Sequence, residues 1–330
     1  MLPLGAGGAR ADDQDWMKFK RRFMEHGERV VDTGNKNISH SESQGWGMLF
    51  AESFDDKEAF QRLFDWTRTA LQRVDGLFSW RWTPDANDHV ADKNNASDGD
   101  ILIAWALARG AKRWNEPRWA AQSKIIRTAL LKRVVVELDG RLLLQPAVQG
   151  FQRGRQQVAN LSYYVWPAIR QFAQFPDERE RWMKLEADGL WLLDKASFGI
   201  HHLPPDWLLA GAGEFRIADG WPPRFGYDAV RIPLYLAWNR EQRLVGRFIV
   251  AWQATKVEGR PPAWIDLNDG TVAPYVASEG YEAVNLVAQF AAGGFKGEAP
   301  AMALSEKDDY YSASLKLLSA MAAREASTTR

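Results

Sequence analysis

Helical periodicity runs through nearly the whole of this 330-residue chain and constrains its fold more than any other feature. Apolar residues recur at three- and four-residue spacing, which is the pattern of amphipathic helices. The eleven segments with this pattern are 14–27, 43–54, 57–73, 99–113, 115–136, 162–175, 178–196, 228–239, 241–256, 280–292 and 306–323. Short extended pieces are expected at Leu77–Trp82 and Leu142–Leu144. Paired helices joined by long loops favour an all-α ring of helical hairpins, with an active face built from loops and helix N-termini.

No linker rich in Pro, Ser and Gly divides the helical segments, so we expect one catalytic domain over residues 12–321. Residues 1–11 end in Ala9-Arg10-Ala11, a small-x-small pattern typical of signal-peptidase sites. We therefore interpret 1–11 as the remnant of an export signal. Residues 322–330 are polar and small, and we expect them to form a disordered, frayed tail.

The charges balance at 42 basic and 42 acidic residues, without a basic run. This balance argues against a nucleic-acid or anionic-membrane partner and favours a neutral ligand. The absence of cysteine excludes a thiol nucleophile, disulfides and Cys-based metal sites, and it suits an oxidising compartment. No segment is long and apolar enough to span a bilayer. Some of the 16 Trp residues are expected to line a surface, where Trp faces stack well on apolar faces such as those of sugar rings, although packing between helices accounts for most of them.

An acidic residue, Glu42, stands at the start of the second helical segment, in the run SHSESQGWGM. Ser41 and Gln44 fit the capping-box pattern, which places Glu42 in the first turn of its helix. The helix dipole lowers the pKa of an acid in that position. A role as general acid therefore requires burial or a second carboxylate to raise the pKa of Glu42.

The neighbours of Glu42 suit such a role. Trp46 is four residues further on and is a candidate to desolvate the carboxyl group. Three small residues leave room for a bulky substrate to approach the acid: Ser43, Gly45 and Gly47.

A second acidic cluster, ASDGD, opens another helical segment. Ser97 and Asp100 fit a capping box, so capping alone explains Asp100. Asp98 is not needed for the cap, and Gly99 beside it permits close approach by a ligand. If Glu42 and Asp98 converge, one carboxyl raises the pKa of the other and the pair divides into acid and base forms. A third acid, Asp228, is followed one helical turn later by Arg231.

Six motifs carry a resemblance to a known family. ASDGDILIAWALARGAKRW stands at Ala96–Trp114 and HSESQGWGMLFA at His40–Ala51. The others are LFSWRW at Leu77–Trp82, NLSYY at Asn160–Tyr164, LPPDW at Leu203–Trp207 and YDAVR at Tyr227–Arg231. Along the chain the motifs occur in the family's order, and over roughly residues 16–290 the chain resembles glycoside hydrolase family 8. Within that family it resembles the periplasmic endoglucanases that accompany bacterial cellulose synthase.

The resemblance implies an (α/α)6 barrel of six inner and six outer helices with an open substrate cleft. It also implies hydrolysis of β-1,4-glucan with inversion. By the family pattern Glu42 is the proton donor, Asp98 grips the sugar at the cleavage point, and Asp228 activates the water. Inversion needs an acid on the leaving oxygen and a base-held water on the opposite face, with the two carboxyls ~6.5–9.5 Å apart.

Four further residues are candidates for the substrate site. Trp80, Tyr163 and Tyr227 are candidates for stacking or hydroxyl binding, with core packing as the alternative. Arg231 is a candidate to orient Asp228 and keep it ionised, with a surface ion pair as the alternative.

The leading interpretation is an inverting endo-β-1,4-glucanase that is periplasmic or secreted, monomeric and independent of cofactors. Its partner is a β-1,4-glucan (cellulose) chain, with a functional link to a cellulose synthase complex. The five histidines lack metal-ligand spacing, so we expect no metal site. One alternative keeps the fold but acts on xylan, chitosan or mixed-linkage β-glucan, and balanced charge disfavours cationic chitosan. Another is a non-hydrolytic accessory protein that grips a glucan without cutting it.

Overall fold

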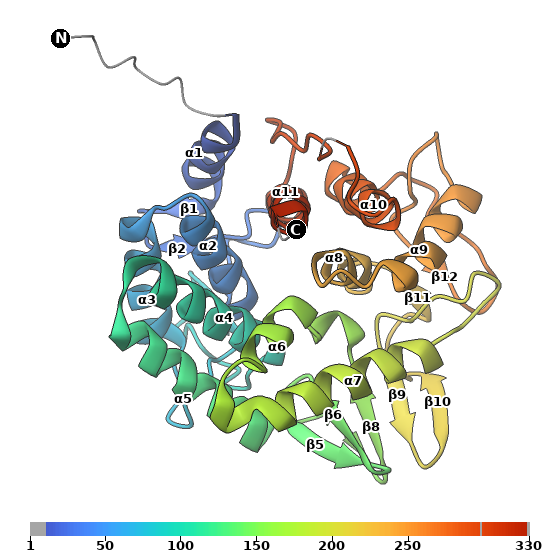
Figure 1. The fold of residues 1–330 in the computed structure, drawn as a ribbon, viewed down its shortest axis with the longest axis horizontal. Coiled ribbons are helices and arrows are strands. Elements are labelled where there is room, and N and C mark those ends of the chain that lie inside the picture. Colours follow the sequence, from blue (N-terminus) through green and yellow to red (C-terminus); the bar gives the residue numbers. More distant parts are fainter. Residues whose placement is uncertain (1–10, 298, 329–330) are drawn as a thin grey trace.

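The computed structural model describes residues 11–297 and 299–328, and helices dominate it (Figure 1). Eleven α-helices occur within these residues, one for each of the predicted segments. They are α1 (Ala11–Phe23), α2 (Ser41–Ser53), α3 (Lys57–Leu71), α4 (Ser97–Trp114), α5 (Pro117–Arg133), α6 (Trp166–Phe172), α7 (Arg179–Lys195), α8 (Arg231–Trp238), α9 (Gln242–Ala254), α10 (Glu279–Ala292) and α11 (Tyr310–Thr328). None of the helices in the described part of the chain has the length and apolar character needed to cross a membrane.

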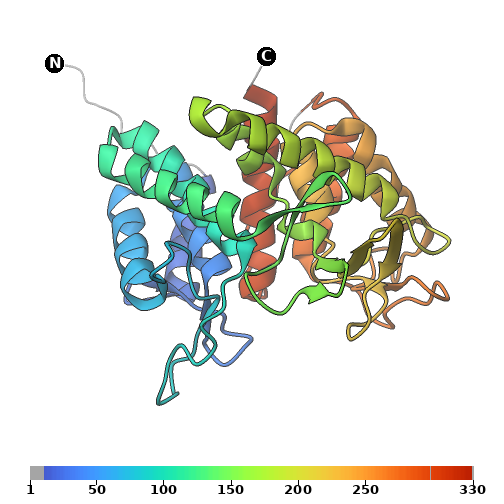
Figure 2. The same cartoon turned by 90° about the horizontal axis from the view of Figure 1, so that it is seen from below.

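Six of the helices form a closed inner ring. In the order α2, α4, α6, α8, α10 and α11, each helix contacts the next, and α11 contacts α2. These helices are buried on most of their surface, and every residue of α8 is buried. Five helices pack outside the ring: α3 on α2, α5 on α4, α7 on α6, α9 on α8 and α10, and α1 on α11 (Figures 1 and 2). The predicted (α/α)6 barrel is therefore confirmed.

The outer layer differs from the prediction in one place, since the described residues supply five outer helices and not six. Between α10 and α11, where a sixth outer helix belongs, the described residues 293–297 and 299–309 form a loop. Gly294 and Gly297 adopt positive φ angles of 74° and 89° there. Such residues interrupt a right-handed helix, and Pro300 lacks the N–H that a helix needs.

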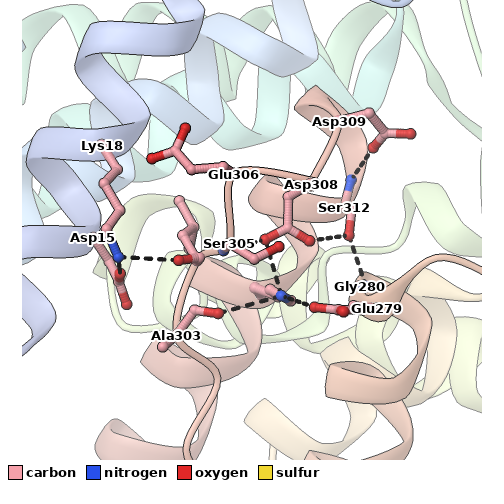
Figure 3. Close-up of polar contacts among 12 residues, drawn as sticks. Asp15, Lys18, Glu279, Gly280, Ala303, Ser305, Glu306, Asp308, Asp309 and Ser312 are labelled. Carbon is pink, nitrogen blue, oxygen red and sulfur yellow. Dashed lines mark hydrogen bonds and ion pairs between the residues drawn. The ribbon is translucent and has the colours of Figure 1, made fainter.

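A buried ion-pair network holds this loop against the inner ring (Figure 3). Lys316 of α11 is 5% exposed and donates to the Asp308 carboxylate at 2.9 Å. The Asp308 carboxylate also accepts the main-chain N–H of Ser305 at 2.7 Å and the hydroxyl of Ser312 at 2.9 Å. On its other side Lys316 pairs with Glu279 of α10. The network thus joins the loop to α10 and α11 where a helix is missing.

The C-terminal residues correct a second prediction. Residues 322–330 were expected to form a disordered tail, but α11 continues to Thr328. Ala322, Ala323 and Ala326 are buried, because their small side chains face the packed side of the helix. Residues 329–330 lie outside the described residues. So do residues 1–10 of the predicted export-signal remnant, whereas Ala11 begins α1.

Strands are short and lie in the loops. The predicted extended piece Leu142–Leu144 falls in β6 (Arg141–Leu144), which pairs with β5 (Val135–Leu138). Of the predicted piece Leu77–Trp82 only β4 (Arg81–Trp82) is a strand, and it pairs with β3 (Ser39–His40).

The four-stranded sheet was not predicted. It has four antiparallel strands in the order β10-β9-β8-β7. They are β7 (Gln152–Arg153), β8 (Gln156–Ala159), β9 (Leu208–Gly211) and β10 (Glu214–Ile217). The remaining short elements are β1 (Met24–Glu25), β2 (Arg29–Val30), β11 (Arg224–Phe225), β12 (Ile265–Asp266) and the 3₁₀ turns η1 (Leu161–Tyr163) and η2 (Pro176–Glu178).

Candidate active site

The three predicted acids meet at one end of the barrel, at the N-termini of inner helices. Glu42 lies in the first turn of α2, Asp98 lies in the first turn of α4, and Asp228 precedes α8. All three carboxyl groups face one guanidinium. Arg231 Nη1 lies 3.5 Å from Glu42 Oε1, while Nη2 lies 3.8 Å from Asp98 Oδ2 and 3.0 Å from Asp228 Oδ1. A single cation is therefore shared by three acids from separate parts of the chain.

The start of α2 is capped differently from the prediction. His40 is the N-cap residue, and the Ser43 hydroxyl accepts its N–H at 3.1 Å and donates to its carbonyl at 2.6 Å. Gln44 turns away and binds both the N–H and the carbonyl of Val30 at 3.0 Å. The predicted capping box of Ser41 with Gln44 is therefore wrong, because the Gln44 amide satisfies the backbone of β2. Glu42 nevertheless lies in the first turn, as that prediction required.

The start of α4 also lacks its predicted capping box. Ala96 is the N-cap residue, and the Ser97 hydroxyl donates to a main-chain oxygen of a distant loop. The Asp100 carboxylate accepts the N–H of Phe78 at 2.7 Å and the Asn95 side-chain amide at 2.8 Å. Burial raises the pKa of Asp100 to about 8. Asp100 therefore anchors the segment that leads into Trp80 instead of capping its own helix.

Glycine brings the two acids together. A Cβ on Gly99 would lie 2.1 Å from Ser41 Oγ and 2.8 Å from the main-chain N of Glu42. A Cβ on Gly45 would lie 2.5 Å from the Cβ of Leu102 in α4. The prediction that these small residues leave room for a ligand is wrong, because the neighbouring helix fills the space. The same holds for the other small residues beside the acid, which are buried: Ser43 and Gly47.

Burial raises the pKa of Glu42 well above its ordinary value, against the opposing charge of Arg231. The Asp98 carboxylate raises it further, through repulsion and by accepting a hydrogen bond from protonated Glu42, and Asp228 adds to the effect. Burial also raises the pKa of Asp98, but Arg231, the Gly99 N–H at 2.8 Å and the hydrogen bond from Glu42 oppose this rise. Burial therefore favours the protonated form of Glu42, which is the form that a general acid needs.

Aromatic residues that the sequence did not single out surround Glu42. Burial raises the pKa of Tyr235, Tyr310 and Tyr311, and all three lie close enough to Glu42 for its ionised form to add to the rise. Trp46, the predicted desolvating residue, is fully buried and lies behind them, with its ring centroid 6.4 Å from Tyr310 and 6.1 Å from Tyr311. Tyr235 belongs to α8 and the other tyrosines to α11, so only the closed ring places them beside the acid.

Arg231 is a buried residue, 5% exposed, so the alternative of a surface ion pair is wrong. Its Nη2 donates to Asp228 Oδ1 and, at 2.9 Å, to the Ser162 hydroxyl. Its Nη1 donates to the Tyr311 hydroxyl at 3.3 Å. Ser162 in turn donates to Asn160 Oδ1 at 2.7 Å. The NLSYY motif thus supports the guanidinium that the three acids share.

Trp80 and Tyr163 both lie beside the acids. The Trp80 carbonyl accepts the N–H at the start of α2 at 3.0 Å, and its partly exposed indole donates to Asp92 at 2.8 Å. Tyr163 is partly exposed, and its ring centroid lies 6.1 Å from that of Trp207. Burial, together with the charges of Asp98 and Asp228, raises the pKa of Tyr163 well above its ordinary value.

Tyr227 precedes the third acid and is 41% exposed. Its hydroxyl lies 3.3 Å from that of Tyr275, which is 50% exposed. Its carbonyl accepts a hydrogen bond from Tyr311 at 2.6 Å. Two exposed tyrosine side chains therefore lie side by side, and one of them belongs to the residue before Asp228.

A cavity of about 1180 Å³ opens at the opposite end of the barrel, lined by the C-terminal ends of α2, α4 and α8. It contains none of the predicted site residues. Its central charges neutralise one another, because Arg109 pairs with Glu52 at 2.7 Å and with Glu325 at 2.6 Å. Within the described residues, no group of three or more His, Cys, Asp and Glu is arranged to hold a metal ion.

Comparison with known proteins shows the family to which the chain belongs. The family model for Glycosyl hydrolases family 8 matches residues 4–325. A probable endoglucanase from Novacetimonas hansenii is 40% identical over 326 residues, covering 96% of this chain and 93% of that protein.

Two solved structures share both fold and sequence with the chain. Endoglucanase Cel10 from Klebsiella pneumoniae has a TM-score of 0.89 and 42% identity, covering 95% of this chain and 99% of that one. The endo-β-1,4-glucanase CMCax from Acetobacter xylinum has a TM-score of 0.87 and 39% identity, covering 96% and 99%. The chain therefore belongs to glycosyl hydrolase family 8.

Proposed function

We propose that the chain is an inverting endo-β-1,4-glucanase in which Glu42 is the proton donor, Asp98 binds the sugar at the cleavage point, and Asp228 activates the water. One observation carries the proposal: the carboxyl groups of Glu42, Asp98 and Asp228 all face the guanidinium of Arg231, at 3.5, 3.8 and 3.0 Å, and burial raises the pKa of Glu42 well above its ordinary value. The endoglucanase names of relatives at 39–42% identity support the substrate class.

The reaction is a single displacement. Glu42 transfers its proton to the glycosidic oxygen as the bond to the leaving sugar breaks. The transfer leaves a carboxylate that Arg231 Nη1, 3.5 Å away, stabilises. Because this ion-pair contact gains strength as the charge develops, it favours the transition state over the ground state.

On the opposite face of the sugar, a water molecule attacks the anomeric carbon and gives its proton to Asp228. The Asp228 side chain is 28% exposed, which fits a group that must reach solvent water. Oδ1 is held by Arg231, which leaves Oδ2 for the water. Asp98 is 4% exposed, and its Oδ1 accepts the Gly99 N–H, so its position relative to the sugar is fixed. The attack on the far face inverts the anomeric configuration.

We propose that the glucan lies across the end of the barrel that carries the acids, with Trp80, Tyr163 and Tyr227 stacking on its rings or binding its hydroxyls. Arg231 acts on the carboxylates in this arrangement and not on the polymer, because it is buried behind them. Following the motif resemblance, we also propose one catalytic domain, which begins near residue 12 and includes α11 to its end at Thr328. We further propose a monomer that is periplasmic or secreted, and a functional link to a cellulose synthase complex.

The test is Glu42→Gln, measured by release of reducing ends from carboxymethyl cellulose. We expect kcat to fall by about 10²–10⁴-fold, the usual contribution of a general acid. Glu52→Gln is the matched control, since Glu52 is a buried acid of the same helix at the opposite end, paired with Arg109 and Arg113. Full activity in Glu42→Gln refutes the acid assignment.

Substrate and stereochemistry are tested on the wild-type protein. We expect cello-oligosaccharide cleavage to yield the α-anomer first, as followed by proton NMR, because inversion converts the β-linkage. A panel of carboxymethyl cellulose, xylan, chitosan and mixed-linkage β-glucan identifies the preferred polymer. Retention on cellulose without any released sugar supports instead a non-hydrolytic accessory protein.

A further inference from the structure

We propose that Asp206 is a positioning residue that fixes the main chain of the water-activating carboxylate, Asp228. The proposal rests on the proposed function, which makes Asp228 the base. Asp206 belongs to the LPPDW motif and lies in the bend before β9, and it is 5% exposed.

Three main-chain donors converge on a single oxygen of Asp206. Oδ1 accepts the N–H of Gly226 at 3.0 Å, of Asp228 at 3.2 Å and of Ala229 at 2.8 Å. Oδ2 lies 3.4 Å from Nε of Arg224. A carboxylate with three N–H groups on one oxygen fixes the orientation of several successive peptide planes. The backbone that carries the Asp228 side chain is therefore set by a residue 22 positions earlier.

The turn is shaped to receive this carboxylate. A Cβ on Gly226 would lie 2.9 Å from Asp206 Oδ2, so only glycine lets the main chain approach this closely. Burial and the nearby Asp228 charge raise the pKa of Asp206 to about 6, while the Ala229 and Gly226 N–H groups and Arg224 oppose the rise. Burying Asp206 as a second acid beside Asp228 costs free energy. The hydrogen bonds that Asp206 accepts from the turn offset this cost.

Asp228 is thus held from two sides. Arg231 holds its side chain at 3.0 Å, and Asp206 holds its main chain. With both ends fixed, the carboxylate keeps one position relative to Glu42 and Asp98. A displacement of about 1 Å at a reacting group can cost on the order of 100-fold in rate, so the main-chain contact has a direct consequence for kcat.

Two substitutions separate hydrogen bonding from charge. Asp206→Asn keeps an oxygen for the three N–H groups but loses the charge facing Arg224, and Asp206→Leu loses both. We expect kcat on cellopentaose to fall about tenfold in Asp206→Asn and about 100-fold or more in Asp206→Leu. KM should stay within about threefold of wild type in both, because the residue touches no substrate.

The matched control is Asp188→Asn in α7. Asp188 is also 5% exposed, and it accepts the Leu142 N–H at 2.8 Å and pairs with Arg141 at 2.9 Å. We expect its kcat to stay within about twofold of wild type. A loss of kcat in Asp188→Asn as large as that in Asp206→Leu overturns a specific role for Asp206.

Crystal structures of the variants give a readout that does not depend on activity. We expect Asp206→Leu to lose the 3.0 Å contact between Asp228 Oδ1 and Arg231 Nη2. If Asp206→Leu keeps this contact, or if its kcat stays within threefold of wild type, the proposal is overturned. If Asp206→Leu does not fold, Gly226→Ala applies the same test, because its Cβ displaces the Asp206 carboxylate. Full activity in Asp228→Asn refutes the base assignment instead, while the crystallographic distance still tests the positioning by Asp206.

Discussion

Two buried cations in this molecule each pair with several carboxyl groups, but the pKa of an acid is lowered in one cluster and raised in the other. Lys316 joins Asp308 and Glu279 at the loop that replaces an outer helix (Figure 3). Arg231 joins Glu42, Asp98 and Asp228 at the N-termini of inner helices. The side chains of both cations are 6% exposed, so burial alone does not distinguish them.

The supply of hydrogen-bond donors distinguishes the two clusters. Burial acts to raise the pKa of Asp308, but hydrogen bonds from Lys316, the Ser305 N–H and Ser312 outweigh it and lower the pKa. At Glu42 burial prevails, because one guanidinium serves three acids, and Oε1 accepts no hydrogen bond from the described residues. The hydrogen bonds to Asp308 therefore favour its ionised, structural form, whereas Glu42 favours the protonated form that acid catalysis needs.

The largest expected effect separates the two cations by activity. Arg231→Met leaves three acids without their common cation and frees the Asp228 side chain, so we expect kcat to fall by about 10³-fold or more. Lys316→Met should keep kcat within about twofold at temperatures where it is folded. Initial rates on carboxymethyl cellulose measure both, and comparable losses of kcat in the two variants contradict the distinction.

Stability should show the reverse order. Lys316→Met leaves Asp308 buried without its cation, and breaking a buried pair costs about 3–5 kcal/mol. The free energy of unfolding from urea titration measures the loss. Lys307→Met, an exposed lysine of the same loop, is the control and should change the unfolding free energy by less than about 0.5 kcal/mol. A stable Lys316→Met would show that the loop is held by other contacts.

The pH dependence of stability should have opposite signs in the two clusters. The pKa of Glu42 is raised in the folded protein, so its contribution to stability is present below its unfolded value of about 4.5 and is lost as pH rises through the folded pKa. Glu42→Gln should therefore gain stability over wild type at neutral pH and lose that advantage below about pH 4.5.

Asp308 should behave in the opposite way, because its folded pKa is lowered. Its contribution is present above the unfolded value of about 3.8 and is lost as pH falls through the folded pKa. Asp308→Asn should therefore be less stable than wild type at pH 7, with a difference that shrinks in acid. Thermal unfolding from pH 3 to pH 8 measures both variants, and slopes of the same sign would rule out the contrast.

The smallest effects come from a matched pair of serines. The Ser162 hydroxyl accepts from Arg231, and the Ser312 hydroxyl donates to Asp308. Ser162→Ala should lower kcat a few-fold, whereas Ser312→Ala should cost about 1–2 kcal/mol of stability and leave kcat unchanged. Measuring kcat and unfolding on both variants tests whether each hydroxyl serves its own cluster.

The sequence predicted the helices well because periodicity is a local signal. Errors in helix boundaries also have local causes. The predicted segment 162–175 becomes helical only at Trp166, because Pro167 lies in the first turn of α6 and the residues upstream form the 3₁₀ turn η1. The motifs pointed to Glu42, Asp98 and Asp228, which the structure brings around Arg231. The role of Gly99 could not be read in advance, since it depends on which helix packs against it. The same applies to Tyr310, Tyr311 and Asp206, whose partners lie far away along the chain.

The contact at Gly99 has a consequence for how such a barrel can change its specificity. The spacing of Glu42 and Asp98 depends on the place where the backbones of α2 and α4 touch, which Gly99 makes possible. Substitution of aromatic side chains in the loops can alter which polymer binds, whereas the core helices determine where the polymer is cleaved. Among enzymes with this barrel, sequence diversity should therefore be high in the residues that contact the polymer away from the cleaved bond, and low in the residues beside that bond.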